Sequence, residues 1–190
     1  MRFGAHALRG GARESLKMLA FDLETTGLDP CVDRITCAAA YDPAAGIERV
    51  FFFHLGDSPE EFMCLLDQAD RLCAFNGGGF DLRFLAHAFD LSVERLTGWR
   101  LKLHDVFVAC KWGMGVTFPL QALLELNGME GKTGSGKEAI RLFEGHRWLE
   151  LGNYCMHDAR LTHRVSSLDK ILLPKTKGMA MDSTGGFFLC

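Results

Sequence analysis

Two carboxylates interrupt an otherwise apolar run, Met-Leu-Ala-Phe-Asp-Leu-Glu over residues 18–24, which then stops at Thr-Thr-Gly-Leu-Asp-Pro. The run is typical of a buried β-strand that ends in a turn. Side chains two positions apart point to the same face of a strand, so Asp22 and Glu24 share the face opposite Phe21. Like charges about 6–7 Å apart on a covered face repel each other unless a cation lies between them. A strand with one solvated face also explains the pair, and both interpretations stay open here.

The order of the expected elements predicts the fold class. Strands over 34–41 and 47–53 follow the first strand, separated by a turn over 42–46. Ser58, Pro59 and Glu61 form the capping signature of a helix that begins near Ser58. Strands and helices then mix, which predicts an α/β domain with a mixed β-sheet flanked by helices. The remaining expected elements are a strand over 71–75, a helix over 80–89, a short strand near 101–104, a helix from near 119 that stops by Gly128, and a long helix over about 147–172.

The chain has 190 residues, of which 48% are hydrophobic and 24% are charged. These values are typical of one globular domain, which we place at 18–173. Residues 1–17 form an Arg-rich extension, either flexible or organelle-targeting, and residues 174–190 form a flexible tail. No apolar run approaches the length of a membrane span, so we expect a soluble intracellular protein, cytoplasmic or organellar. The seven cysteines include no Cys-x-x-Cys pair, which argues against a zinc site or a disulfide framework.

The net charge of −3 excludes a protein that holds nucleic acid by bulk attraction. A polyanionic partner would have to be held by a local patch or through bound metal ions.

A glycine-rich turn, Asn76-Gly-Gly-Gly-Phe80-Asp81, follows the strand expected over 71–75. Three glycines at the end of a strand allow a ligand or another element to approach the backbone closely. Asp81 lies near a helix N-terminus, where an acid is also a good structural choice. On its own, this segment favours the structural interpretation, a capped helix after a flexible loop.

Tyr154 and Asp158 are four residues apart in the last expected helix, so they share one face. That face also carries the apolar stripe of Leu151, Leu161 and Val165. An Asp in a core-facing stripe is costly unless it is paired or binds a metal. We therefore interpret Asp158 as functional.

Four oxygen donors from a strand, a turn and a late helix can converge on hard divalent cations. Carboxylates without Cys or His partners suit Mg²⁺ or Mn²⁺ and not zinc. Paired cations held by carboxylates are suited to in-line displacement at phosphorus.

The three motifs resemble those of the DEDD family of 3′–5′ exonucleases. Phe21–Leu28 looks like the first exonuclease motif, Asn76–Asp81 resembles the second, and Tyr154–Asp158 resembles the third in the tyrosine-containing (DEDDy) subclass. Asn153 stands where the other subclass has its His. Residues 132–162 are similar to exonucleases of the DNA polymerase B proofreading type.

The resemblance implies a ribonuclease H-like fold in which Asp22, Glu24, Asp81 and Asp158 hold two Mg²⁺ or Mn²⁺ ions. Asp22 would bridge both ions, Glu24 and Asp158 would complete the first, and Asp81 would serve the second. Tyr154 would orient the attacking water.

Thr25, Leu28 and Asn76 match positions that contact the terminal nucleotide in the family. The resemblance thus implies a metal-dependent 3′–5′ exonuclease acting on single-stranded DNA. Two alternatives are an exoribonuclease with the same site, since nothing here reads the 2′-hydroxyl, and a non-catalytic nucleic-acid-binding module. Protein partners are not predicted.

The segment Gly131-x-x-x-x-Gly136-Lys137 spells most of a phosphate-binding P-loop. Glu138 stands where Ser or Thr would bind magnesium, and no apolar strand precedes the segment. We interpret it as a flexible, basic loop near the substrate backbone and not as an NTPase site.

Overall fold

The computed structural model describes residues 18–114, 117–132, 134–168, 171–172 and 186–187. The extension over 1–17 and nearly all of the tail over 174–190 therefore lie outside the described residues. The two short strands β6 (Ile171–Leu172) and β7 (Gly186–Phe187) pair antiparallel beside the main body.

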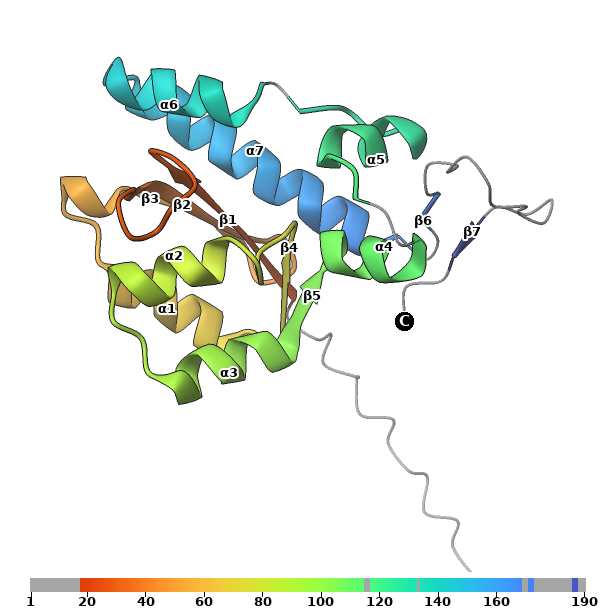
Figure 1. The fold of residues 1–190 in the computed structure, drawn as a ribbon, viewed down its shortest axis with the longest axis horizontal. Helices are drawn as coiled ribbons and strands as arrows, with labels where there is room; N and C mark the ends of the chain where they lie inside the picture. The colour runs from red at the N-terminus through yellow and green to blue at the C-terminus, as the bar shows by residue number, and fades with distance from the viewer. Residues whose placement is uncertain (1–17, 115–116, 133, 169–170, 173–185, 188–190) are drawn as a thin grey trace, which may run out of the picture.

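A mixed five-stranded sheet, in the order β3-β2-β1-β4-β5, forms the centre of the molecule (Figure 1). Strand β2 runs antiparallel to both β1 and β3, whereas β4 runs parallel to both β1 and β5. The prediction of an α/β domain with a mixed sheet is confirmed. The strands are β1 (Met18–Thr25), β2 (Ile35–Asp42), β3 (Ile47–Phe51), β4 (Arg71–Ala74) and β5 (Leu103–Asp105).

Helices cover both faces of this sheet (Figure 1). On one side, α1 (Pro59–Gln68), α2 (Asp81–Ala88) and α3 (Val93–Lys102) pack over a core that includes Phe21 and Phe62. On the other side, the long helix α7 (Trp148–Ser166) crosses β1 and β2 and carries α6 (Gly136–Glu144). The other elements are the 3₁₀ turn η1 (Phe53–Leu55), α4 (Val106–Met114) and α5 (Leu120–Leu126).

β1 is a central strand, and its second face is covered by α7, so the interpretation of a solvated second face is wrong. Leu19, Phe21 and Leu23 are almost fully buried in the core. Glu24, on the opposite face, is only 8% exposed. The two carboxylates of β1 therefore lie between the sheet and α7, with Glu24 buried and Asp22 partly exposed.

Three predictions of local structure need correction. The last helix ends at Ser166 and not at 172, because residues 171–172 pair with β7 in a second sheet. Helix α3, capped by the Ser92 hydroxyl, was not predicted. Helix α6 was also missed, because its first turn lies in the segment interpreted as a loop.

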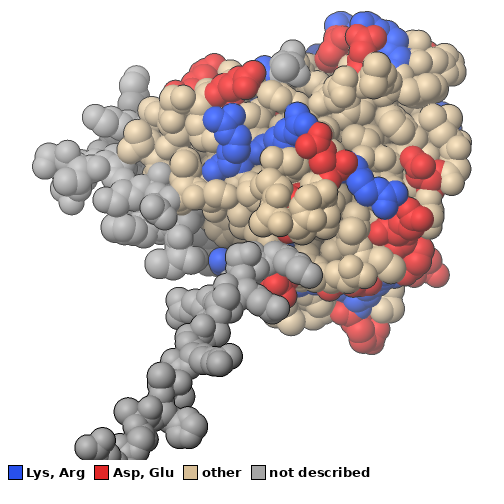
Figure 2. Space-filling model, turned by 180° about the vertical axis from the view of Figure 1, so that it is seen from behind, with Lys and Arg blue, Asp and Glu red and all other residues tan. Residues whose placement is uncertain are grey.

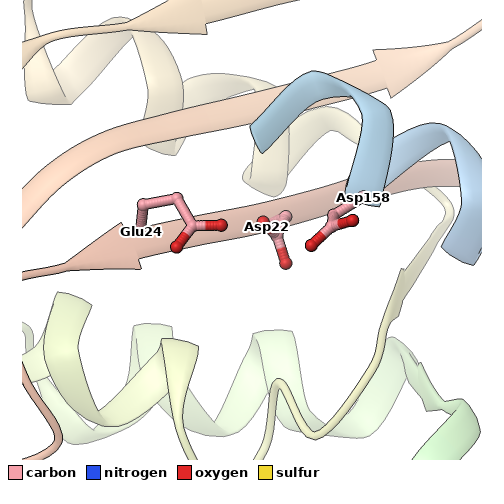
Figure 3. Close-up of side chains that lie close together, drawn as sticks. All are labelled: Asp22, Glu24 and Asp158. Atoms are coloured by element: carbon pink, nitrogen blue, oxygen red, sulfur yellow. The ribbon is translucent and has the colours of Figure 1, made fainter. Parts of the chain in front are cut away.

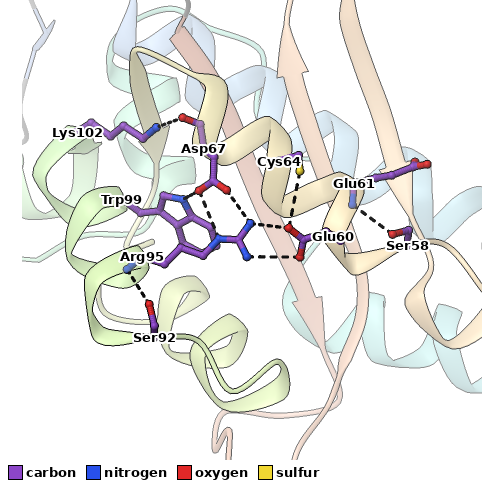
Figure 4. Close-up of polar contacts among 9 residues, drawn as sticks. All are labelled: Ser58, Glu60, Glu61, Cys64, Asp67, Ser92, Arg95, Trp99 and Lys102. Atoms are coloured by element: carbon purple, nitrogen blue, oxygen red, sulfur yellow. Dashed lines mark hydrogen bonds and ion pairs between the residues drawn. The ribbon is translucent and has the colours of Figure 1, made fainter.

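A polar cluster joins α1 to α3 on the face of the sheet away from α7 (Figure 4). Arg95 forms ion pairs with Glu60 at 3.0 Å and with Asp67 at 2.6 Å. Asp67 also accepts a hydrogen bond of 2.7 Å from the indole nitrogen of Trp99, a side chain that is 1% exposed. The cluster satisfies the single donor of a buried indole while it joins the two helices.

Six of the seven cysteines lie in the described residues, and all six are free. Within the same residues, no helix is both long enough and apolar enough to cross a membrane.

Candidate active site

A cavity of about 1090 Å³ opens at the end of β1, between the turn after β4 and the first turn of α6. Its wall includes all eight side chains predicted from the sequence as catalytic, metal-binding or substrate-binding. They are Asp22, Glu24, Thr25, Leu28, Asn76, Asp81, Tyr154 and Asp158.

Three of the four predicted metal ligands form a compact cluster within this cavity (Figure 3). One carboxylate oxygen from each of Asp22, Glu24 and Asp158 lies within 4.8 Å of the others. Strand β1 supplies the first two, because residues two apart share a face, and α7 supplies the third where it crosses that face. The helix is long enough to cross β1 and β2, which is how a residue so distant in sequence reaches the strand.

The cluster is electrostatically strained. Burial raises the pKa of Asp22 well above its usual value, and the nearby charges of Asp158 and Asp81 raise it further. Burial also raises the pKa of Glu24, with Asp22 adding to the effect. The pKa of Asp158 is raised by burial, although the ammonium of Lys132 opposes the shift. Three carboxylates that resist ionisation in this way are stabilised as anions when a cation lies among them.

Lys132 provides one such cation. Its Nζ lies 2.5 Å from Oδ2 of Asp158, a side chain that is only 3% exposed. Burial lowers the pKa of Lys132, but the charge and hydrogen bond of Asp158 together with the charges of Asp22 and Glu24 outweigh this effect, and the net shift is upward. The other carboxylate oxygen of Asp158, Oδ1, is buried and has no hydrogen-bond partner among the described residues.

Asp81 lies in the same cavity but outside the compact cluster. Its Oδ1 accepts a hydrogen bond of 2.9 Å from the backbone N–H of Leu23, which ties the start of α2 to β1. Burial raises the pKa of Asp81 to about 7. Gly77 explains the close approach, because a Cβ there would lie 2.4 Å from the Cβ of Ala74 and 3.4 Å from Phe21.

Asp105, at the end of β5, holds the turn that contains Asn76. Its Oδ1 accepts a hydrogen bond from the backbone N–H of Asn76, and its Oδ2 accepts one from Gly78, each at 2.9 Å. Asn76 adopts a positive φ of 65°, a conformation that Asn tolerates better than most residues. The sequence analysis missed Asp105, although an Asp directly after a short expected strand was an available signal.

Tyr154 lies one helical turn from Asp158, as predicted, and is 5% exposed. Its hydroxyl is buried and has no hydrogen-bond partner among the described residues. Burial raises the pKa of this phenol, and the charge of Asp158 raises it further, so the hydroxyl stays protonated. A protonated, unpartnered hydroxyl beside a carboxylate cluster can donate a hydrogen bond to a ligand in the cavity.

The loop between β1 and β2 presents Leu28, which is 82% exposed at the edge of the cavity. Asp33 braces this loop by accepting hydrogen bonds from the Thr26 hydroxyl and the Asp29 backbone N–H, at 3.1 and 3.0 Å. The Thr25 hydroxyl donates to the backbone oxygen of Gly27 at 2.6 Å. An exposed leucine on a braced loop can pack against an apolar part of a ligand.

Cys155 lies behind the cluster and is a further residue that the sequence analysis did not single out. Its thiol lies 3.4 Å from the backbone oxygen and 3.6 Å from Oδ2 of Asp22, and it donates weak hydrogen bonds to both. Burial raises the pKa of this thiol well above its usual value, so the sulfur remains a donor.

The P-loop-like segment does not form an NTPase site. Among the described residues, the element before it is helix α5 and not a strand, and Gly136 and Lys137 begin α6. His157 contacts the backbone oxygen of Gly131 at 3.2 Å, which fixes the loop to α7.

Comparison with known proteins assigns the class of this fold. A model of the ribonuclease H superfamily matches residues 19–167. The chain is therefore a ribonuclease H-like α/β domain, and it belongs to the ribonuclease H superfamily, as its motifs predicted. No curated protein sequence matched the chain.

Solved structures with the same fold include a DNA polymerase and NrnC. The family B DNA polymerase of the hyperthermophilic archaeon Pyrobaculum calidifontis superposes with a TM-score of 0.60 at 19% identity, covering 82% of this chain. The chain spans only 24% of that polymerase. Brucella melitensis NrnC with bound Mg²⁺ superposes with a TM-score of 0.56 at 23% identity, covering 80% of this chain and 71% of NrnC. These likenesses establish the fold, which this chain shares with nucleases.

The donor set fits a hard divalent cation. All donors of the cluster are carboxylate oxygens, which Mg²⁺ and Mn²⁺ prefer. Lys132 alone does not stabilise all three carboxylates as anions. Oδ1 of Asp158 has no partner among the described residues, and the pKa values of Asp22 and Glu24 are still raised, so a further cation would stabilise the cluster.

Proposed function

We propose that this protein is a metal-dependent 3′–5′ exonuclease that removes nucleotides from the 3′ end of single-stranded DNA. The observation that carries the proposal is the convergence of Asp22, Glu24 and Asp158 within 4.8 Å in a large cavity. Glu24 and Asp158 are buried and Asp22 is only partly exposed, which is unfavourable for three acids this close together unless they bind a ligand. The superfamily membership supports a nuclease, and the three motifs support the DEDDy subclass.

In this proposal, Asp22, Glu24, Asp81 and Asp158 hold two divalent ions. Asp22, Glu24 and Asp158 would hold the first ion, and Asp81 would hold the second together with Asp22. Bound there, the ions supply activation of the attacking water and stabilisation of the leaving oxygen.

The remaining residues bind and orient. Tyr154 donates its hydroxyl hydrogen bond to the attacking water, because no described residue competes for it. In this proposal Leu28, Thr25 and Asn76 contact the terminal nucleotide at the 3′ end, as their motif positions imply, and all three line the cavity beside the β1–β2 loop.

A second candidate function uses the same site but takes RNA instead of DNA as its substrate. Another structure of Brucella melitensis NrnC is described as bound to pGG, at a TM-score of 0.53 and 22% identity. A short oligonucleotide would fit a cavity of about 1090 Å³, and the three motifs on which the proposal rests do not distinguish deoxyribose from ribose. An exoribonuclease acting on short RNA is therefore the alternative.

The test is digestion of matched 3′-labelled and 5′-labelled DNA and RNA strands with Mg²⁺, with Mn²⁺ and with a chelator. We expect stepwise shortening from the 3′ end of DNA, inhibition by a blocked 3′ terminus but not by a blocked 5′ terminus, and no reaction with the chelator. Efficient cutting of circular single strands would indicate an endonuclease, and hydrolysis in excess chelator would refute the metal-dependent mechanism.

Asp22→Asn and Asp90→Asn form a matched pair for this assay. Asp90 is exposed and has a φ of 47°, which Asn accepts, so its substitution leaves the structure intact. We expect Asp22→Asn to lose nearly all activity and Asp90→Asn to keep it.

A further inference from the structure

The first turn of α6 forms part of the cavity wall opposite the glycine-rich turn. Ser135, Gly136 and Lys137 line the cavity, and all three are exposed. Ser135 is the N-cap residue, in an extended conformation, and its side chain makes no capping hydrogen bond. Among the described residues, no group accepts a hydrogen bond from the backbone N–H of Gly136 or Lys137. The turn therefore offers a hydroxyl and free amides, the groups that bind anions at helix N-termini.

Tyr154 supplies a second observation on the same wall. A Cβ on Gly134 would lie 3.2 Å from Cε2 of Tyr154, so the ring lies directly beneath the loop that leads into α6. The Tyr154 side chain is 5% exposed, lines the cavity, and has a hydroxyl without a partner among the described residues. A buried donor without a partner on the wall beside a free helix N-terminus indicates that an oxygen-bearing ligand fills this part of the cavity, where the proposed function places the attacking water.

The charges of the cavity wall point to Lys137 in particular. Two lysines line the cavity, and Lys132 is already paired with Asp158. Lys137 forms no ion pair with a described residue. The acid in the same turn, Glu138, is paired with Arg141 at 3.4 Å and faces a different pocket. Lys137 is therefore the free positive charge on the wall of a cavity whose centre is acidic.

One face of the molecule shows how the surface charges are distributed. Basic and acidic side chains are interspersed on the face of the molecule seen in Figure 2. The net charge is −3, so a nucleic acid cannot be held by the overall charge.

From these observations we infer that the N-terminal turn of α6 is a binding site for a phosphodiester adjacent to the scissile one. The Ser135 hydroxyl, the Gly136 and Lys137 amides, and the Lys137 ammonium hold its oxygens, while the acidic cluster acts at the neighbouring phosphate. This inference rests on the proposed function. It assigns to the P-loop-like segment a role in gripping the strand and none in nucleotide hydrolysis.

The test measures binding of a short 5′-fluorescein-labelled single strand by fluorescence anisotropy, with Ca²⁺ as the cation, over a series of salt concentrations. Each phosphate contact on a single strand contributes about −0.7 to the slope of log K against log salt. We expect Lys137→Gln to weaken binding by about 3- to 10-fold and to reduce the magnitude of that slope by about 0.7.

Arg71→Gln is the matched control. Arg71 is exposed and pairs with Met18 at the start of β1, about 13 Å along the strand from Asp22. We expect its removal to leave the slope unchanged. Thermal unfolding of both variants checks that they are folded.

Strands with one neutral methylphosphonate locate the contact. We expect the difference between wild type and Lys137→Gln to vanish when the second linkage from the 3′ end is neutral, and to persist when a distant linkage is neutral. An unchanged salt slope for Lys137→Gln, or a difference that vanishes only with a neutral terminal linkage, would overturn the inference. Failure of the wild type to bind or degrade any strand would instead refute the proposed function.

Discussion

Tyr154 and Asp158 share one face of α7 but have different proposed roles. Substitutions at the two positions should therefore have different effects on the rate and on metal binding. Tyr154→Phe removes a hydroxyl that has no described partner and keeps the packing of the ring. If the hydroxyl orients the attacking water, its loss should cost about 1–3 kcal/mol of barrier, or roughly 10- to 100-fold in rate. Single-turnover rates normalised to folded protein measure this effect.

Asp158→Asn is the comparison. It removes a charge of the cluster, so we expect both activity and stabilisation by Mn²⁺ to be lost, whereas Tyr154→Phe should keep the latter. A Tyr154→Phe rate equal to that of wild type would reject a catalytic role for the tyrosine and leave the four acids as the proposed site.

Asp105 is predicted to act on the site through the backbone it holds. In Asp105→Asn, an amide replaces one of the two oxygens that accept from Asn76 and Gly78, and two donors then face each other. A hydrogen bond to a charged group contributes about 1.5–3 kcal/mol, so we expect a stability loss of about 2 kcal/mol. Because Asn76 would shift within the cavity wall, KM for the strand should rise as well.

A general loss of stability must be distinguished from this local effect. Asp67→Ala provides a variant destabilised by a similar amount, far from the glycine-rich turn. If both variants showed the same change in KM, Asp105 would have only a structural role.

At the scale of single residues, the sequence identified those site residues whose charge conflicts with the apolar pattern around them. Asp22 and Glu24 interrupt an apolar strand, and Asp158 interrupts an apolar helix stripe, so each could be identified without a structure. The ion pair between Lys132 and Asp158 could not, because it joins a loop to a helix with no local periodicity between them.

At the scale of elements, the contact between α1 and α3 leads to a prediction about stability alone. Asp67→Ala leaves the indole N–H of buried Trp99 without its acceptor and removes one ion pair of Arg95. An unsatisfied buried donor costs about 1–3 kcal/mol, so denaturant unfolding should show a loss in this range. Activity per folded molecule should stay unchanged, since this cluster lies across the sheet from α7.

Asp67→Asn tests whether the hydrogen bond from Trp99 or the ion pair with Arg95 contributes more to stability. It keeps an oxygen for the Trp99 indole but weakens the pairing with Arg95, whose ion pairs are partly exposed. Exposed ion pairs contribute little, so Asn should recover most of the stability lost with Ala. Equal losses for the two variants would assign the stabilisation to the ion pairs instead.

Two of the mispredicted boundaries, the end of α7 and the start of α6, share a physical cause, which is tertiary contact overriding local pattern. The helical spacing of Leu161, Val165 and Leu172 suggested a helix to 172. Leu172 instead lies in β6, where it pairs with Gly186 of β7, and it is 44% exposed. Gly136 opens α6 despite a low helix propensity, because the amphipathic remainder of the helix buries Ala139 and Leu142 against α7. By contrast, the Ser58 cap and the Asp81 start of α2 were confirmed, since capping signals are local.

At the scale of the whole molecule, the buried acids link folding, pH and metal. In the metal-free protein, burial raises the pKa of Asp81 from 3.8 to about 7. Between these two values the unfolded chain has released this proton and the folded chain still binds it, so stability falls as pH rises and levels off above about 7. The upward shifts of Asp22 and Glu24 act in the same direction.

A bound divalent ion should reverse this trend, because it competes with protons for the same carboxylates. Free Mn²⁺ at about 100 times its Kd stabilises the native state by about 2.7 kcal/mol, and the apparent Kd should fall as pH rises. Thermal unfolding at a series of pH values, with and without Mn²⁺, measures both effects. In the metal-free protein, we expect Asp81→Asn to reduce the loss of stability with rising pH, since the Asn side chain does not titrate. If the metal-free protein became more stable as pH rose through the interval from 3.8 to about 7, or if stabilisation by Mn²⁺ were independent of pH, the buried acids would not form the linked site described.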